Sequence, residues 1–191
     1  MPVRFQHDQF PNSVYYITFI CYKWKHLFSI SQAYDAVYKW FDKLYEKNIS
    51  VFSYVIMPNH LHVILHFPAM PKSLNTVIGN AKRFMAYDII KGLEKYKEFS
   101  LLEDLQSIVS EREQTKGQRH KVFKEGFDAK ECQSIKFILE KIKYIHHNPV
   151  SKRWQLVNDF TEYEYSSASF YEREIKKFKW LVHVNDVLQQ F

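Results

Sequence analysis

Apolar residues gather in three short runs near the start of the chain, and each run has the composition of a β-strand. The runs are VYYITFICY at Val14–Tyr22, ISVFSYVIM at Ile49–Met57 and HLHVILHF at His60–Phe67. β-Branched and aromatic side chains dominate all three, as in strands that pack within a sheet. Only the turn residues Pro58 and Asn59 separate the second run from the third, so these two runs predict a β-hairpin.

Other segments repeat apolar residues every three to four positions, which is the period of an amphipathic helix. Ser31 is the expected N-cap of the first of these helices, and Pro149 ends the last one. The predicted helices are Ser31–Lys47, Ser73–Gly92, a short one at Leu101–Glu111, and Glu131–Asn148. A fourth strand is expected at His120–Gly126, between the last two helices.

The predicted order of elements is strand, helix, strand, strand, helix, strand, helix. This order is typical of the split βαβ arrangement of a ferredoxin-like sandwich, an α+β fold built on an antiparallel sheet. We expect the helices on one face of the sheet and the other face open to a ligand. The length of 191 residues indicates a single domain over 1–191, with a less regular excursion at about 93–120 and a variable tail at about 172–191.

Composition argues against several classes of protein. Only 4 glycines occur, and neither G-x-x-x-x-G-K-[ST] nor G-x-G-x-x-G is present, so no nucleotide cofactor is expected. The 2 cysteines, Cys21 and Cys132, lie far apart, which argues against a disulfide framework and a cysteine-based zinc site. No apolar run is long enough to span a bilayer, and the N-terminus lacks the apolar stretch of a signal peptide. We therefore expect a cytoplasmic protein without a membrane partner.

Two histidines follow the predicted turn directly and share one face of the third strand. Alternate side chains of a strand point to the same side, so His60, His62 and His66 project together while Leu61 faces the core. Two imidazoles placed as neighbours can bind one divalent metal ion. The pattern is short, however, and packing or hydrogen bonding explains it at least as well; for His66 packing is the better explanation.

The last predicted helix carries a tyrosine that its core does not explain. Its apolar stripe consists of Ile135, Ile138, Leu139, Ile142 and Ile145. Tyr144 falls nearly opposite the centre of that stripe, and Asn148 lies four residues on, along the same face. The pair offers a phenol that can attack phosphorus and an amide oxygen that can bind a metal. Exposed tyrosines and helix-end asparagines are common, so this geometry alone is not specific.

Together, these segments resemble a known family. PNHLHVIL resembles the HUH motif, and YIHHNPV followed by EYEYSSASFY resembles the catalytic helix and aromatic-Ser-Ser signature of the REP-associated tyrosine transposases and their insertion-sequence relatives. The resemblance extends from the first strand to about Tyr171. It implies that His60 and His62 bind a metal and that Tyr144 is the nucleophile. Asn148 stands where some relatives carry a glutamine as the third ligand, and its side chain is shorter.

This resemblance implies metal-dependent chemistry on single-stranded DNA marked by hairpins. With Mg²⁺ or Mn²⁺ present, the tyrosine attacks a phosphodiester, forms a 5′-phosphotyrosine and releases a 3′-hydroxyl. A second 3′-hydroxyl can then rejoin the strands without ATP. Relatives are often dimers, so a homodimer is expected, with Tyr144 acting at the metal site of its own chain or of its partner.

The formal net charge of +6 suits a polyanionic partner such as DNA. The candidates for phosphate contacts are Lys82, Arg83, Arg119 and Lys121. Solvated basic faces and loops explain these residues at least as well. The aromatic share of 17% is likewise explained by an aromatic core better than by base stacking.

Three other functions are alternatives to this interpretation. A ferredoxin-like sandwich can serve as an RNA-binding platform, but the expected glycine-aromatic signature is not visible. A catalytically silent, domesticated protein could bind DNA hairpins without cutting them. Binding alone would not require all four of His60, His62, Tyr144 and Asn148, so their presence together argues for activity. A rolling-circle or relaxase nuclease shares the chemistry, but YIHHNPV fits the transposases better.

Overall fold

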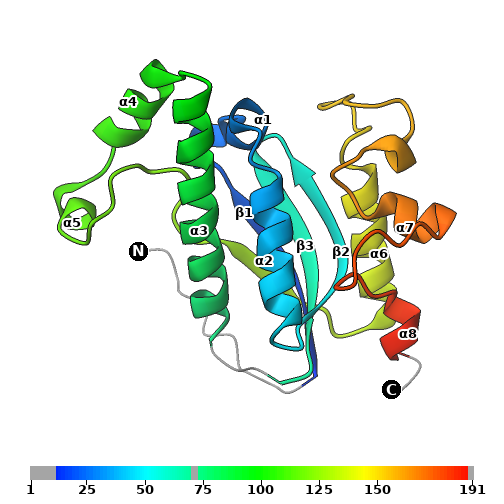
Figure 1. The fold of residues 1–191 in the computed structure, drawn as a ribbon. Coiled ribbons are helices and arrows are strands. Elements are labelled where there is room, and N and C mark those ends of the chain that lie inside the picture. The colour runs from blue at the N-terminus through cyan, green and yellow to red at the C-terminus, as the bar shows by residue number, and fades with distance from the viewer. Residues whose placement is uncertain (1–11, 70–72, 189–191) are drawn as a thin grey trace.

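The computed structural model describes residues 12–69 and 73–188. At its centre is a four-stranded antiparallel sheet with the strand order β2-β3-β1-β4 (Figure 1). The strands are β1 at Ser13–Ile20, β2 at Ser50–Met57, β3 at His60–Phe67 and β4 at Asp128–Glu131. The predicted α+β class and split βαβ topology are therefore confirmed.

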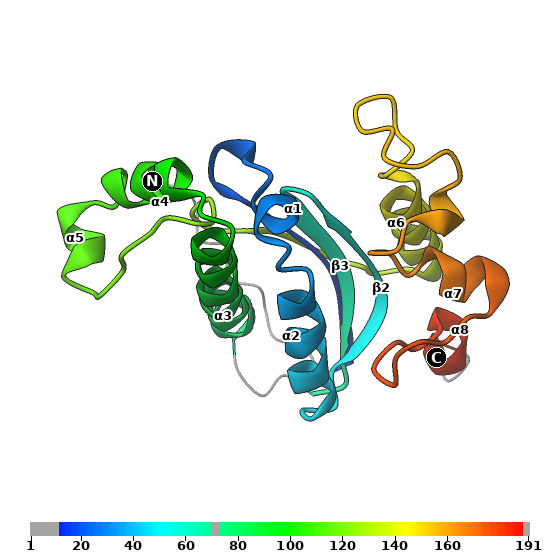
Figure 2. The same ribbon diagram turned by 45° about the horizontal axis from the view of Figure 1, so that its top comes forward.

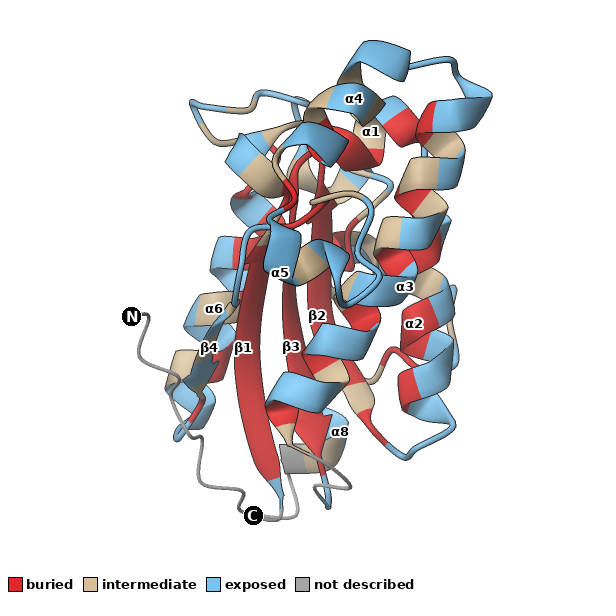
Figure 3. Ribbon diagram, turned by 90° about the vertical axis from the view of Figure 1, so that its left-hand side faces the viewer, coloured by how far each residue is buried: buried red, intermediate tan, exposed pale blue. Residues whose placement is uncertain are grey.

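The hairpin of β2 and β3 forms where the sequence predicts it, and β3 begins at His60. β3 lies between β2 and β1, and its pairing with β1 sets Thr18 directly opposite His62. Every residue of β3 is buried, and β1, β2 and β3 are buried along most of their length in Figure 3. A strand with both faces buried needs packing partners on each side of the sheet.

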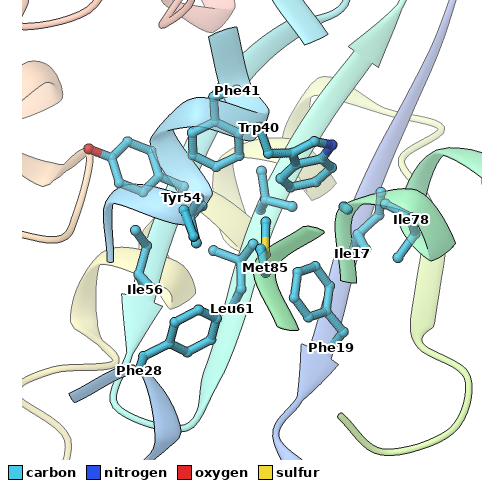
Figure 4. Packing of buried hydrophobic residues seen from close by; sticks show 14 of the residues in the cluster. Ile17, Phe19, Phe28, Trp40, Phe41, Tyr54, Ile56, Leu61, Ile78 and Met85 are labelled. Carbon is cyan, nitrogen blue, oxygen red and sulfur yellow. The ribbon is translucent and has the colours of Figure 1, made fainter. Parts of the chain in front are cut away.

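On one face, that packing comes from helices α2 (Asp35–Tyr45) and α3 (Leu74–Lys95), as Figure 2 shows. Their apolar sides meet the odd-numbered residues of β3 in a core rich in aromatic rings. Figure 4 shows Trp40 and Phe41 of α2 over Leu61 of β3. The hydroxyl of Ser73 accepts the backbone N–H of Thr76, so α3 starts one residue after a side-chain cap.

The predicted N-cap of α2 is wrong. Ser31 is the last residue of a separate helix, α1 (Leu27–Ser31), where its hydroxyl donates to the Leu27 carbonyl at 2.6 Å. A left-handed residue, Gln32 with φ 55°, ends α1. Gly92, the predicted end of α3, lies inside that helix instead. A Cβ atom there would overlap the Ser31 carbonyl oxygen, so Gly92 permits the close approach of α3 to α1.

Helix α6 (Ile135–His147) covers the second face of the sheet, which we expected to be open (Figure 2). Its residues Ile138, Ile142 and Ile145 are buried in a second core with apolar side chains of β1, β2 and β3. Those strands carry large apolar groups on both faces, so both faces require cover. The buried stripe is narrower than predicted, because Ile135 and Leu139 remain 48% and 46% exposed.

The fourth strand lies a few residues beyond its predicted position. Residues 120–126 run as an irregular segment that meets the sheet through a bridge between Cys21 and Phe123. Gly126 then takes a positive φ of 72° just before β4 begins.

The helix predicted at Leu101–Glu111 is divided in two. The remaining helices are α4 (Phe99–Ser107), α5 (Glu111–Gln114), α7 (Ala168–Arg173), α8 (Val184–Leu188) and the 3-10 turns Tyr22–Trp24 and Phe160–Glu162.

The C-terminal segment closes the outer edge of β2. The Ile56 N–H donates to the Tyr165 carbonyl at 2.8 Å, and the Ser167 N–H donates to the Tyr54 carbonyl at 3.0 Å. This pairing satisfies backbone groups that an open sheet edge would leave exposed. Within the described residues, no helix is long and apolar enough to cross a membrane.

Candidate active site

His60 and His62 lie side by side at the start of β3, on the face that α6 covers. Their Nε2 atoms face each other at 3.1 Å, and both residues are buried. Burial, helped by the positive charge of Arg153, lowers the pKa of His60 to about 4. Burial also lowers the pKa of His62 well below its ordinary value. Both rings are therefore neutral at neutral pH, which is the form that binds a metal ion.

Asn59 fixes which nitrogen of His60 carries the proton. The amide nitrogen of Asn59 donates to the Trp24 carbonyl at 2.9 Å, so its oxygen must be the atom that faces His60. The His60 Nδ1–H donates to this oxygen at 2.6 Å. In the neutral ring Nε2 then has no proton, and its lone pair points at His62.

Two hydroxyls contact the far nitrogen of His62. The Tyr16 hydroxyl lies 2.9 Å and the Thr18 hydroxyl 2.6 Å from Nδ1 of His62. A hydroxyl can donate or accept, so either tautomer of His62 is satisfied. When Nδ1 donates to a hydroxyl, Nε2 of His62 also presents a lone pair toward His60. Both histidines thus have the outer partners that orient metal-binding imidazoles.

The spacing of the pair fits an octahedral divalent ion. Two ligands at right angles, each about 2.1 Å from such an ion, are about 3.0 Å apart, and the two Nε2 atoms are 3.1 Å apart. Across the described residues, no group of three or more His, Cys, Asp and Glu side chains could hold a metal. Within the described residues, the histidine pair is therefore without a third histidine, cysteine or carboxylate ligand, and an amide such as that of Asn148 is a candidate.

Tyr144 projects from α6 beside the histidine pair. Its ring is edge-on to the His62 ring, with 5.5 Å between ring centroids, and edge-on to the Tyr16 ring at 6.4 Å. The side chain is nevertheless 52% exposed. The helix thus brings a phenol to the metal-binding candidates from the same chain and leaves it open to a substrate.

Lys141 lies one turn before Tyr144 and adds positive charge at this place. Its ammonium is over the rings of Tyr16 and Tyr144, at 5.2 and 5.7 Å from their centroids. Such contacts hold the ammonium beside the phenol. An anionic phosphodiester would be attracted to the same point.

Asn148 follows α6 as its C-cap and is buried. Its backbone N–H donates to the Ile145 carbonyl at 3.3 Å, and its carbonyl accepts the Ser151 N–H at 3.2 Å. These bonds use only its backbone, and its side-chain amide has no hydrogen bond to any residue of the described ranges. Its role as third ligand stays a prediction.

The other histidines near these elements have structural partners. His146 is buried, and its Nε2 contacts the hydroxyls of Ser53 at 3.1 Å and Ser167 at 2.9 Å. His147 stacks on Phe160, with 4.2 Å between centroids. His66 stacks on Phe52 at the far end of β3, in line with the packing expected for it.

Two of the four predicted phosphate-binding cations already bind oxygen atoms of the protein. The ammonium of Lys82 donates to the carbonyls of Lys124 and Gly126, at 2.7 and 2.6 Å. Lys121 forms an ion pair of 2.8 Å with Glu113. Arg83 and Arg119 are exposed. The structure brings none of the four into contact with the histidine pair, and phosphate contacts by these residues stay predictions.

Sequence reasoning missed four residues that shape this site, namely Tyr16, Thr18, Asn59 and Lys141. Tyr16 and Thr18 come from β1, and only the register of β1 against β3 reveals that they contact His62. Asn59 and Lys141 leave a signal in the sequence. One directly precedes the first histidine, and the other lies three residues before the tyrosine, on the same side of the helix.

Comparison with known proteins supports the fold. No protein-family model matches the sequence, and no curated protein matches it either. Among solved structures, a REP-associated tyrosine transposase bound to a REP hairpin matches with a TM-score of 0.62 and 12% sequence identity. The match covers 95% of this chain and 98% of the other. The resemblance expected from the motifs is therefore confirmed as a shared fold over nearly the whole chain.

Proposed function

We propose that this protein cleaves and rejoins single-stranded DNA near hairpins, with Tyr144 as the nucleophile. The observation that carries the proposal is the position of Tyr144 against His62, whose Nε2 faces that of His60 at 3.1 Å. A nucleophile beside a divalent-metal site is the arrangement that phosphodiester transfer needs. The hairpin-bound transposase of the same fold supports DNA as the substrate class.

Each residue of the site has its own role in the proposed cleavage step. Tyr144 attacks the phosphorus, its proton passes to solvent, and the bond from phosphorus to the 3′ oxygen breaks. The products are a 5′-phosphotyrosine and a 3′-hydroxyl, whose oxygen takes up a proton. Lys141 attracts the anionic strand to the phenol. A bound Mg²⁺ or Mn²⁺, held by His60 and His62 with Asn148 as a third ligand, would withdraw charge from the phosphodiester oxygens.

Rejoining is the reverse of this step with a different strand. A second 3′-hydroxyl attacks the phosphotyrosine, a new bond from phosphorus to the 3′ oxygen forms, and the Tyr144 oxygen leaves and regains its proton. The covalent link conserves the bond energy, so no nucleoside triphosphate is consumed. This agrees with a sequence that carries no phosphate-binding glycine loop.

The test uses labelled single-stranded hairpin DNA from the flanks of the protein's own gene, incubated with Mg²⁺ or Mn²⁺. On a denaturing gel, the wild-type protein should give a covalent protein–DNA band and Tyr144→Phe should give none. The variant should still bind the hairpin, because the phenol oxygen contributes little to binding. Tight binding by the wild type with no covalent band in either metal would instead indicate a catalytically silent hairpin-binding protein.

A further inference from the structure

A cavity of about 640 Å³ opens beside the histidine pair, at the end of the sheet where the β2–β3 turn lies. Two segments far apart in the sequence form its walls, one at 24–34, which contains α1 and ends just before α2, and one at 153–165 after α6. We call it the Trp24–Trp154 pocket. Its lining includes Trp24, His26, Asn59, Arg153, Trp154 and Tyr165.

The pocket adjoins the candidate active site, because two of its lining tryptophans contact His60. The His60 ring lies 5.8 Å from the Trp24 ring and 5.8 Å from the Trp154 ring, measured between centroids. Asn59 lines the pocket and also orients His60, as described above. A group bound here would therefore be separated from the histidine pair by no more than the rings of Trp24 and Trp154 and the Asn59 side chain.

Trp24 is held in a backbone conformation that a tryptophan rarely adopts. Its φ is 58°, and the preceding Lys23 has φ 49°. Such values cost free energy for a residue with a side chain, and they occur preferentially at functional sites. The Asn59 amide holds the Trp24 carbonyl in place at 2.9 Å. The ring remains 45% exposed, so burial in a core does not compensate for this strain.

The chemistry of the pocket suits a flat, anionic ligand. The Arg153 guanidinium lies over both indole rings, 5.2 Å from the Trp24 centroid and 5.8 Å from the Trp154 centroid. None of the described residues that line the pocket is Asp or Glu. Aromatic faces stack on bases, and a guanidinium contacts phosphate. The volume lies in the range of small-ligand pockets, about 300–1,000 Å³.

We propose that the Trp24–Trp154 pocket binds an unpaired base of the strand whose phosphodiester lies at His60 and His62. The base stacks on the indole rings, and Arg153 contacts the neighbouring phosphate. This proposal rests on the proposed function, because it assigns one part of the same DNA substrate. It gives the protein a means to prefer unpaired nucleotides next to the cleaved bond.

The test measures binding of a short oligothymidylate by quenching of tryptophan fluorescence, without metal and in the Tyr144→Phe background. Of the 4 tryptophans, Trp40 and Trp180 are buried, so quenching reports on Trp24 and Trp154. We expect Trp24→Gly, which suits the left-handed backbone, to weaken binding about 5- to 150-fold, measured by fluorescence anisotropy of labelled DNA. Trp154→Leu should weaken it similarly.

The matched control is Tyr45→Leu. Tyr45 is 43% exposed and, like the pocket tryptophans, has a cation over its ring, which here belongs to a lysine. It is the last residue of α2, however, and lies at the end of the sheet opposite the pocket. This variant should bind as the parent does. A strand whose unpaired nucleotides are abasic should bind weakly to the parent and lose nothing further with Trp24→Gly. An equal loss on abasic and normal strands would overturn base stacking.

The outcomes separate this proposal from the proposed function. Suppose that the wild type forms a covalent adduct and that folded Trp24→Gly and Trp154→Leu bind oligothymidylate as tightly as the parent does. This result overturns base binding in the pocket and leaves the nuclease function standing. Tryptophan-dependent binding without any adduct supports the pocket and contradicts cleavage. Circular dichroism of each variant establishes that it is folded before its affinity is compared.

Discussion

At the scale of single residues, the site depends on groups that orient the histidines as much as on the histidines themselves. Asn59 accepts the Nδ1 proton of His60 and donates to the Trp24 carbonyl, so one amide arranges both a metal-binding candidate and the wall of the neighbouring pocket. The hydroxyls of Tyr16 and Thr18 both contact Nδ1 of His62 and orient that ring. Residues of this kind have no motif of their own, which is why the sequence did not reveal those on β1.

The first residue-scale prediction concerns metal binding. His60→Ala and His62→Ala should each abolish detectable Mn²⁺ binding in isothermal titration and reduce metal-dependent adduct formation by at least about tenfold, in line with the loss of a ligand or its support. His66→Gln is the control, since His66 is a buried histidine on the same strand face but at its far end. Unchanged Mg²⁺ dependence in both alanine variants would remove the metal assignment.

The second concerns acid stability. Burial first, and the charge of His147 second, lower the pKa of His146 to about 3, against 6.5 for an ordinary histidine. Between these values the unfolded chain binds a proton that the folded chain does not, so the free energy of unfolding falls as the pH drops from 6.5 toward 3. His146→Gln should reduce this slope by up to about 1.4 kcal/mol per pH unit. Urea denaturation across this pH range checks it, and an unaltered slope would contradict it.

At the scale of elements, periodicity predicted the hairpin, α3 and α6, because a strand alternates and a helix repeats regardless of its neighbours. Periodicity wrongly made Ser31 the N-cap of α2, although Ser31 ends α1. The left-handed residue that ends α1 is Gln32, and the sequence has no glycine there to indicate the helix end. It left the second face of the sheet open because alternation cannot show that Tyr16 and Ile64 are covered by α6. These outcomes depend on tertiary packing, which local sequence does not encode.

Two glycines of α3 provide an internal comparison at this scale. A Cβ at Gly79 would meet no atom within 4 Å, so Gly79→Ala should stabilise the protein by about 1 kcal/mol through helix propensity. A Cβ at Gly92 would collide with the Ser31 backbone, so Gly92→Ala should destabilise it by about 1–3 kcal/mol through overpacking. Chemical denaturation measures both, and equal effects of the two substitutions would show that α1 and α3 do not pack as described.

At the scale of the whole molecule, the fold gathers the site from segments that are distant in sequence. β3 supplies the histidines, α6 the tyrosine, and the segments before α2 and after α6 the pocket (Figure 1). The two motifs indicated the chemistry from sequence, whereas the pocket arises only when these segments meet. The expected homodimer stays a prediction, but Tyr144 already lies beside His62 of its own chain.

This arrangement predicts cleavage by a single chain. Tyr144→Phe and His62→Ala should each be inactive, and an equimolar mixture should be inactive too, because neither chain then holds a tyrosine next to an intact histidine pair. If the tyrosine acted on a partner's metal site, a mixed dimer would contain one intact site. Adduct formation restored on mixing would therefore contradict action within one chain.

The most direct measurement for the central claim is mass spectrometry of the protein–DNA adduct after digestion with protease and nuclease. We predict a nucleotide joined through its 5′ phosphate to Tyr144, with a free 3′-hydroxyl on the released strand that a DNA polymerase can extend. A nucleotide on any other residue, or a released strand that ends in a 3′ phosphate, would contradict Tyr144 as the nucleophile of a 5′-phosphotyrosine reaction.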